Sequence, residues 1–196
     1  MNRIACLVLA AGQASRFGGR KQFADIKGKP MIVRSLEQLK PIFHNDLYTL
    51  IGAYAEDLRP IVEPLSEVIH HPQWESGLGS SLSKGVRAIV ENRTYDGIMV
   101  VLTDQVALRE EDYKYLLDQF NGQQIVAAEY SQHLGVPAIF PASFFDRLLD
   151  LKGDQGARKL IQENQDQVVS VRLPMAEIDI DTRLDLKSYH KMGYIT

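Results

Sequence analysis

The stretch Leu9–Phe23, LAAGQASRFGGRKQF, decides how the chain is interpreted, because an apolar segment runs directly into a loop rich in glycine and cationic side chains. Residues 4–11 are mostly apolar and predict a buried first strand. Gly12, Gly18 and Gly19 follow, interleaved with three basic residues. Glycines let backbone amides approach a ligand closely, and cationic side chains bind phosphate oxygens. Two interpretations are open here: a cradle for a triphosphate, or a solvated basic turn.

The loop matches neither of the common phosphate-binding motifs. Gly28-Lys29 is followed by Pro30, and Phe23 stands where a P-loop has glycine. The G-x-G-x-x-G dinucleotide fingerprint is also missing from this stretch. If the loop binds a nucleotide, we expect Arg16 and Lys21 to supply the charge for a different kind of site.

Composition narrows the class of protein. The 196 residues are 45% hydrophobic with a formal net charge of −3, so we expect one domain over residues 1–196 and no basic surface for nucleic acid or membrane. No apolar run reaches the roughly 18 residues of a membrane span. The single cysteine, Cys6, excludes an intramolecular disulfide and lies in an apolar run, which favours a buried core residue in a cytoplasmic protein.

Strand-like and helix-like segments alternate along the chain. This order predicts a three-layer α/β/α fold with a mostly parallel, twisted sheet of the Rossmann-like kind. Ligands of such sheets bind beyond the carboxyl ends of the strands. We expect strands at 4–9, 47–51, 67–70, 98–102, 125–128, 138–140 and 168–173, and helices at 30–39, 56–65, 80–90, 110–120, 143–151, 155–164 and from about 182.

Two acidic segments follow predicted strands. Asp104, in LTDQ, comes directly after the apolar run 98–102 and would bind a divalent cation or cap the next helix. Asp179 and Asp181, in DIDT, alternate and so share a face; they would share a site or, with Thr182, cap the last helix.

Two glycine-rich segments are equally ambiguous. Residues 71–85, HPQWESGLGSSLSKG, hold the only tryptophan and would present amides and hydroxyls to a ligand, or form a plain loop with a serine cap. Residues 152–160, KGDQGARKL, would bind a ligand or form an ordinary capped helix start. Adjacent His70 and His71 lack the further ligands of a structural zinc site, and no G-x-S-x-G elbow indicates a serine hydrolase.

Together these segments resemble a known family. LAAGQASRFGGRK is similar to the nucleotidyltransferase signature, and HPQWESGLGSSL, LTDQ, GVPAIF, GDQGAR and DIDT follow in the order of the MobA-like nucleotidyltransferases, with most similarity to the molybdenum cofactor cytidylyltransferases. The resemblance implies Mg²⁺-dependent transfer of a nucleotidyl group from CTP to a phosphorylated acceptor, molybdopterin, and a client molybdoenzyme for the product. Ala11 is the residue on which the preference for CTP depends.

The resemblance also assigns roles to individual residues. It implies that Arg16, Lys21 and Asp104 are catalytic and that Asp104 and Asp181 bind the metal. The implied nucleotide-binding set is Leu9, Ala10, Ala11, Gly12, Arg16, Lys21, Gly77, Ser80, Ser81 and Asp104. The implied acceptor-binding set is Gln105, Gly135, Val136, Pro137, Gly153, Asp154, Gly156 and Arg158.

Two positions depart from the family pattern. Val106 replaces the usual proline after Asp-Gln, and Val136 replaces the histidine that molybdopterin enzymes commonly have between glycine and proline. The missing imidazole leaves a sugar or polyol phosphate open as the acceptor. A non-catalytic nucleotide-binding or cofactor-chaperoning protein is a further alternative. The presence of Arg16, Lys21, Asp104 and Asp181 disfavours it, because a protein that only binds a nucleotide could lose the metal-binding carboxylates.

Overall fold

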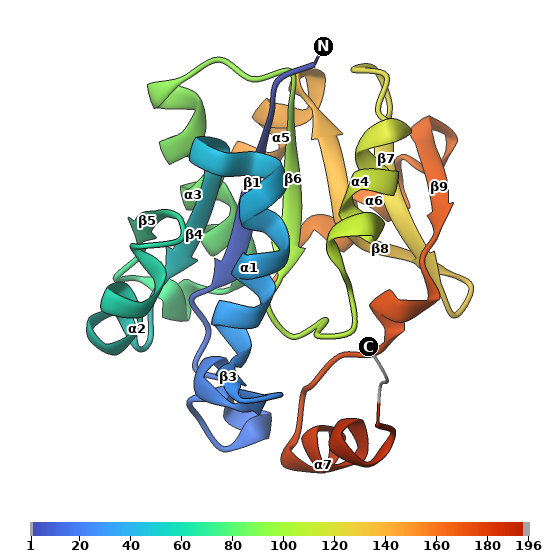
Figure 1. Ribbon diagram of the computed structural model, residues 1–196. Coiled ribbons are helices and arrows are strands. Elements are labelled where there is room, and N and C mark those ends of the chain that lie inside the picture. The colour runs from blue at the N-terminus through green and yellow to red at the C-terminus, as the bar shows by residue number, and fades with distance from the viewer. Residues whose placement is uncertain (1, 194–196) are drawn as a thin grey trace.

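The computed structural model describes residues 2–193 and contains one seven-stranded sheet between two layers of helices (Figure 1). This confirms the predicted three-layer α/β/α architecture. The strands of the large sheet are β1 (Ile4–Ala10), β4 (Leu47–Ile51), β5 (Glu67–His70), β6 (Gly97–Leu102), β7 (Ile125–Tyr130), β8 (His133–Pro141) and β9 (Val168–Arg172). A separate hairpin pairs β2 (Asp25–Ile26) with β3 (Lys29–Pro30).

The sheet has the strand order β5-β4-β1-β6-β8-β7-β9, and only β8 runs antiparallel to its neighbours. β8 reverses because Ser131 and Gln132 both take positive φ and join it to β7 by a two-residue hairpin turn. The carboxyl ends of the other strands therefore meet at one edge, which faces the bottom of Figure 1 near α7 (Arg183–Lys191).

Helices cover both faces of the sheet. α1 (Met31–Phe43), α2 (Ala55–Val62) and α4 (Glu110–Asp118) pack on one face, and α3 (Leu78–Asn92), α5 (Phe145–Leu149) and α6 (Ala157–Glu163) on the other. In the part of the chain from residue 2 to 193, no helix is long and apolar enough to cross a membrane.

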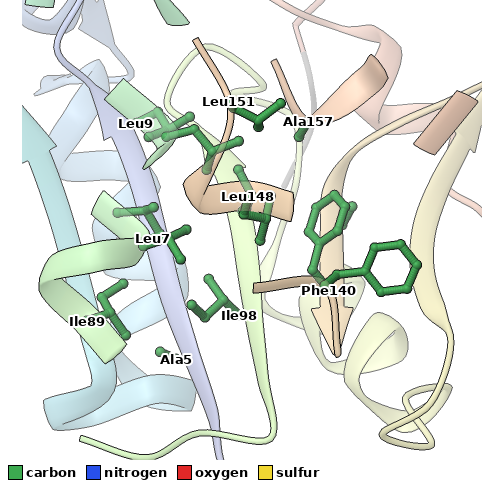
Figure 2. Packing of buried hydrophobic residues seen from close by; sticks show 14 of the residues in the cluster. Ala5, Leu7, Leu9, Ile89, Ile98, Phe140, Leu148, Leu151 and Ala157 are labelled. Atoms are coloured by element: carbon green, nitrogen blue, oxygen red, sulfur yellow. The ribbon is translucent and has the colours of Figure 1, made fainter. Parts of the chain in front are cut away.

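Residues of β1 alternate between the two cores. Ala5, Leu7 and Leu9 point to the α3 side, as Figure 2 shows, whereas Cys6 and Val8 point to the α1 side. These five residues are completely buried, except Leu9, which is 8% exposed. Because both faces of β1 are covered, its sequence is one continuous apolar run. Cys6 is buried as expected, and burial raises the pKa of its thiol.

The second half of the chain differs most from the sequence prediction. The expected strand 138–140 is the end of the nine-residue β8, whose earlier part contains Gly135 and Pro137 and lacks a strand-like pattern. The expected helix 143–151 is a 3₁₀ turn (Ala142–Phe144) followed by the short α5. The expected last helix starts beside Thr182, as predicted.

Candidate functional site

The glycine-rich loop after β1 is held in place by a buried glutamine. Gln22 donates from Nε2 to the carbonyl oxygens of Ala10 (3.2 Å) and Gly12 (2.8 Å). Short 3₁₀ turns at Ser15–Phe17 and Lys21–Phe23 shape the rest of the loop. The loop thus has a defined backbone course, anchored by buried Gln22, although most of its residues from 12 to 20 are exposed.

The three basic residues of the loop take different directions. Arg20 points away from the sheet edge, pairs with Asp57 at 3.0 Å and stacks over Phe23. Lys21 and Arg16 instead reach the carboxylates at the sheet edge. Lys21 Nζ lies 2.8 Å from Asp104 Oδ2 and 3.0 Å from Asp181 Oδ1. Arg16 Nη1 lies 2.8 Å from Asp181 Oδ2.

A backbone hydrogen bond explains why Asp104 and Asp181, which are 77 positions apart in the sequence, lie close together. Asp104 follows β6, and its carbonyl oxygen accepts a hydrogen bond from Ile180 N at 3.0 Å. The capping role falls to Thr182, whose hydroxyl accepts from Asp185 N at 3.2 Å. Asp181, one residue earlier, is therefore free to direct its side chain at Lys21.

The electrostatics of this centre follow from partial burial. Burial by itself would lower the pKa of Lys21, but the neighbouring charges of Asp104 and Asp181 outweigh it and raise the pKa above its usual value. Asp179 lies within the field of the same acids. Partial burial, with the charges of Asp104 and Asp181, raises the pKa of Asp179.

The pair of acids fits a divalent cation. Asp104 Oδ1 is buried and has no hydrogen-bond partner in the described chain, and the Asp104 side chain is only 16% exposed. Both acids already lie within 3.0 Å of one cationic atom, Lys21 Nζ. Mg²⁺ is commonly held by one or two carboxylates together with substrate phosphates. No cluster of three or more histidine, cysteine or acidic residues suited to a metal occurs among residues 2–193.

A pocket of about 290 Å³ opens beside the loop on the α3 side of the sheet. Its size suits one heterocyclic ring system with part of a sugar. It brings together five residues of the expected nucleotide-binding set with four that were not expected. The lining consists of Leu9, Ala11, Gly12, Gly77 and Ser81 with Trp74, Glu75, Leu78 and Leu102.

Two residues of the expected nucleotide set lie elsewhere. Ala10 points into the opposite core, because successive residues of a strand face opposite sides, and only its carbonyl oxygen reaches the loop through Gln22. Ser80 is not part of the pocket lining. Its hydroxyl lies 3.3 Å from His71 Nε2 and 2.8 Å from Ser76 Oγ.

A bulge in β8 gathers one group of the expected acceptor-binding residues. Ala127 pairs with Ala138 and Ala128 with Gly135, which leaves Val136 and Pro137 outside the ladder. The Val136 carbonyl oxygen consequently accepts from Gln105 Nε2 (2.8 Å) and from Tyr130 Oη (3.3 Å). A Cβ on Gly135 would lie 2.5 Å from Tyr130 Oη, so a side chain at this position would displace the Tyr130 hydroxyl.

The second acceptor group lies against the nucleotide loop. Gly153 O accepts from Gly79 N at 2.7 Å, and a Cβ on Gly77 would meet Gly153 and the Asp154 carboxylate. A Cβ on Gly156 would meet Leu78, which lines the pocket. The structure thus joins the segments 77–79 and 152–156 directly, although the sequence analysis assigned them to different ligands. Exposed Arg158 lies near enough to Tyr130 for its charge to act on that hydroxyl.

Several residues of this region escaped the sequence analysis. Gln22 and Tyr130 carry no motif, and only their tertiary contacts reveal them. Trp74 was noted as the single tryptophan, which is the one signal that could have placed it at a ligand pocket. Glu75 gives no signal in the sequence.

Known proteins provide an independent comparison. Purine catabolism protein PucB of Bacillus subtilis is 29% identical over 171 residues, which cover 80% of each chain. A nucleotidyl transferase from Methanothermobacter thermautotroptrophicus superposes with a TM-score of 0.82 at 19% identity, covering 98% of both chains. The Rv0371C complex with manganese from Mycobacterium tuberculosis gives a TM-score of 0.76 at 22% identity, covering 95% of this chain and 97% of that one.

The two structural likenesses show the fold. The family itself is shown by a sequence model, the MobA-like NTP transferase domain, which matches residues 6–168. The match covers most of β1, the glycine-rich loop and all of the expected acceptor-binding residues, and it ends before Asp181. By that match this chain belongs to the MobA-like NTP transferase family.

Proposed function

We propose that the chain is a cytidylyltransferase that moves CMP from CTP to the phosphate of molybdopterin and releases pyrophosphate. The observation that carries the proposal is the convergence of Lys21, Arg16, Asp104 and Asp181 beside a pocket of nucleobase size. Ala11 lines that pocket, in accord with the preference for CTP inferred from its place in the signature. The manganese complex of the structural relative supports use of a divalent cation.

The reaction needs no covalent enzyme intermediate. An ionised oxygen of the acceptor phosphate attacks the α-phosphorus of CTP, a new P–O bond forms, and the bond to the bridging β-phosphate oxygen breaks. Its electron pair leaves with pyrophosphate. The chain contributes position and charge: the loop 12–23 holds the triphosphate, and Arg16 and Lys21 stabilise the negative charge that builds up on the leaving group.

Asp104 and Asp181 would hold Mg²⁺, which neutralises phosphate charge at the reacting centre when it is bound. Lys21 Nζ lies between these acids in the structure, so its ammonium group would have to turn toward the phosphates for a cation to bind there. Gln105, Gly135, Val136 and Pro137 would border the acceptor on the other side of Asp104.

A turnover assay tests the proposal. Pyrophosphate release is measured with Mg²⁺, each of the four nucleoside triphosphates, and molybdopterin carrying molybdenum. Release with CTP and that acceptor is the expected result. Stabilisation by CTP and Mg²⁺ without release would keep the donor site and exclude molybdopterin.

Val136 favours a second candidate acceptor, a sugar or polyol phosphate. An aliphatic side chain stands where a molybdopterin enzyme commonly has an imidazole, and its carbonyl oxygen is engaged by Gln105. Release of pyrophosphate with CTP and such a phosphate, but not with molybdopterin, would establish this alternative.

A further inference from the structure

The 290 Å³ pocket has an uneven distribution of polar groups. Apolar side chains and glycines make up most of its lining. Among the described residues that line it, the polar side-chain groups are the Ser81 hydroxyl, the Glu75 carboxylate and the indole N–H of Trp74. Ser81 is 5% exposed, so its hydroxyl lies deep, whereas Glu75 is exposed at the rim. An apolar pocket with few polar groups owes its selectivity to those groups.

Glu75 is carried by a short turn whose backbone is fixed on both sides. It lies in the 3₁₀ turn Trp74–Ser76, where Ser76 Oγ donates to Gln73 O at 2.5 Å and Gly77 N donates to Trp74 O at 3.2 Å. Trp74 packs so closely on Gly52 that a Cβ there would lie 2.6 Å from Trp74 Cβ. The turn therefore presents residue 75 at a constant place on the rim.

The carboxylate of Glu75 has no ion pair or hydrogen bond with another residue of the described range 2–193. Its two oxygens only accept hydrogen bonds, so a ligand that meets them favourably has to bring N–H or O–H groups. A triphosphate brings none, whereas the ribose hydroxyls and the amino group of a base do. The mostly apolar lining of the pocket favours the flat base over the polar sugar. CTP and UTP carry the same ribose, so a difference between them reports the base alone.

We propose that Glu75 selects the nucleobase by accepting a hydrogen bond from the exocyclic amino group of cytosine. The proposal rests on the proposed cytidylyl transfer and deepens it by naming the residue that distinguishes CTP from UTP. Glutamate accepts from the cytosine N4 amino group in other recognition sites. Uracil has a carbonyl oxygen at the same ring position, and two acceptors facing each other repel. The selectivity thus arises from one attractive and one repulsive contact.

The single tryptophan supplies the test. Trp74 lines the pocket, so its fluorescence reports a base entering it without any catalytic turnover. The wild-type chain is titrated with CTP and with UTP in the presence of Mg²⁺. We expect CTP to bind at least about 20-fold more tightly than UTP, the range of a hydrogen bond to a charged group.

Glu75→Gln then isolates the contact. An amide either donates or accepts, so the ratio of the two dissociation constants should fall to within about threefold. Removing the negative charge would strengthen the binding of both triphosphates equally, and the ratio cancels that effect. Glu91→Gln, an exposed change on α3 outside the pocket, is the matched control and should keep the wild-type ratio.

The outcomes separate the two proposals. Equal binding of CTP and UTP by the wild-type chain, or an unchanged ratio in Glu75→Gln, overturns the role of Glu75 and leaves the transferase proposal standing. If none of the triphosphates binds, by fluorescence or by equilibrium dialysis, the nucleotidyltransferase proposal fails together with this inference.

Discussion

At the scale of single residues, Lys21 connects the two halves of the proposed site. It extends from the glycine-rich loop to Asp104, which follows β6, and to Asp181 in the segment before α7. The Lys21 side chain is only 13% exposed, so the electrostatic interactions of its ammonium group are stronger than those of a surface lysine. One side chain thus serves the acids in the free protein and the phosphates in the proposed complex.

Lys21→Ala is expected to lower turnover at least about 100-fold, since one charge-stabilising contact of this kind is worth roughly 2.7–4 kcal/mol in the transition state. Asp104→Ala should have a similar effect because it removes a proposed metal ligand. Pyrophosphate release measures turnover, and circular dichroism verifies the fold. Lys29→Ala, which breaks only a surface pair with Glu37, is the control. Turnover within a few-fold of wild type in Lys21→Ala would refute the assigned role.

At the scale of elements, the first turn of α3 packs tightly against the loop 152–156. Gly79 N donates to Gly153 O, and a Cβ on Gly79 would lie 2.6 Å from Gln155 O and 2.9 Å from Lys152 O. These are backbone atoms, so relief requires a shift of the loop. The contact makes the two segments one structural unit.

Gly79→Ala should therefore reduce the free energy of unfolding by about 1–3 kcal/mol, although alanine usually favours a helix. Gly12→Ala is the comparison, because its Cβ would meet nothing within 4 Å. We expect Gly12→Ala to leave the urea unfolding midpoint unchanged while it weakens CTP binding in the pocket. Equal midpoints for the two variants would contradict the tight packing.

The capping box of α7 sets the course of the segment that holds Asp181. Thr182 Oγ1 accepts from Asp185 N, and Asp185 Oδ2 accepts from Thr182 N at 2.6 Å. Thr182→Ala should cost about 1 kcal/mol and lower the melting temperature by about 2–4 °C, measured by thermal unfolding. Thr182→Ser keeps the hydroxyl and should retain most of the stability. A loss as large in the serine variant would show that the methyl group, not the cap, is responsible.

At the scale of the whole molecule, a second cluster of charged residues, centred on Asp46, lies at the end of the sheet opposite to the proposed site. Asp46 accepts from Tyr95 Oη at 2.7 Å and pairs with Arg3 at 3.0 Å and Arg93 at 3.1 Å. These residues precede or flank β4, β1 and β6, the three adjacent central strands. Burial would raise the pKa of Asp46, but hydrogen bonds from Arg3, Tyr95 and Arg93 outweigh it and lower the pKa.

Asp46→Asn is expected to reduce the free energy of unfolding by about 1–2 kcal/mol at pH 7. The lowered pKa means that the contribution of the carboxylate is complete above its unfolded pKa of about 3.9 and disappears as pH falls through the lower folded value. Urea unfolding at pH 7, 4.5 and 3 should show the difference between wild type and variant shrinking only at the last pH.

Asp118→Asn is a suitable control for this series, because exposed Asp118 lies at the same end of the sheet without an ion pair to another residue between 2 and 193. Its difference from wild type should stay near zero. A difference for Asp46→Asn that persists or grows on acidification would exclude the proposed linkage.

Much of the fold was predictable from local patterns. Continuous apolar runs such as Ile4–Ala10 and Gly97–Leu102 become buried central strands because only such residues tolerate a sheet covered on both faces. In the segment His133–Pro141, the local pattern predicted a strand only at residues 138–140. Its glycine and proline break the strand pattern, yet pairing with β6 and β7 keeps it extended on both sides of the bulge.

By itself the sequence determined the three-layer fold and the family signature, because apolar periodicity and the order of motifs are properties of the chain alone. It also predicted Arg16, Lys21, Asp104 and Asp181 as site residues. The tertiary structure decided the rest: that Lys21 lies between the two acids, that Ala10 turns away, and that the loop at Gly153 packs on the loop at Gly77. These contacts join residues far apart in the sequence. Their partners are chosen by strand register, a bulge and backbone hydrogen bonds, which no local pattern encodes.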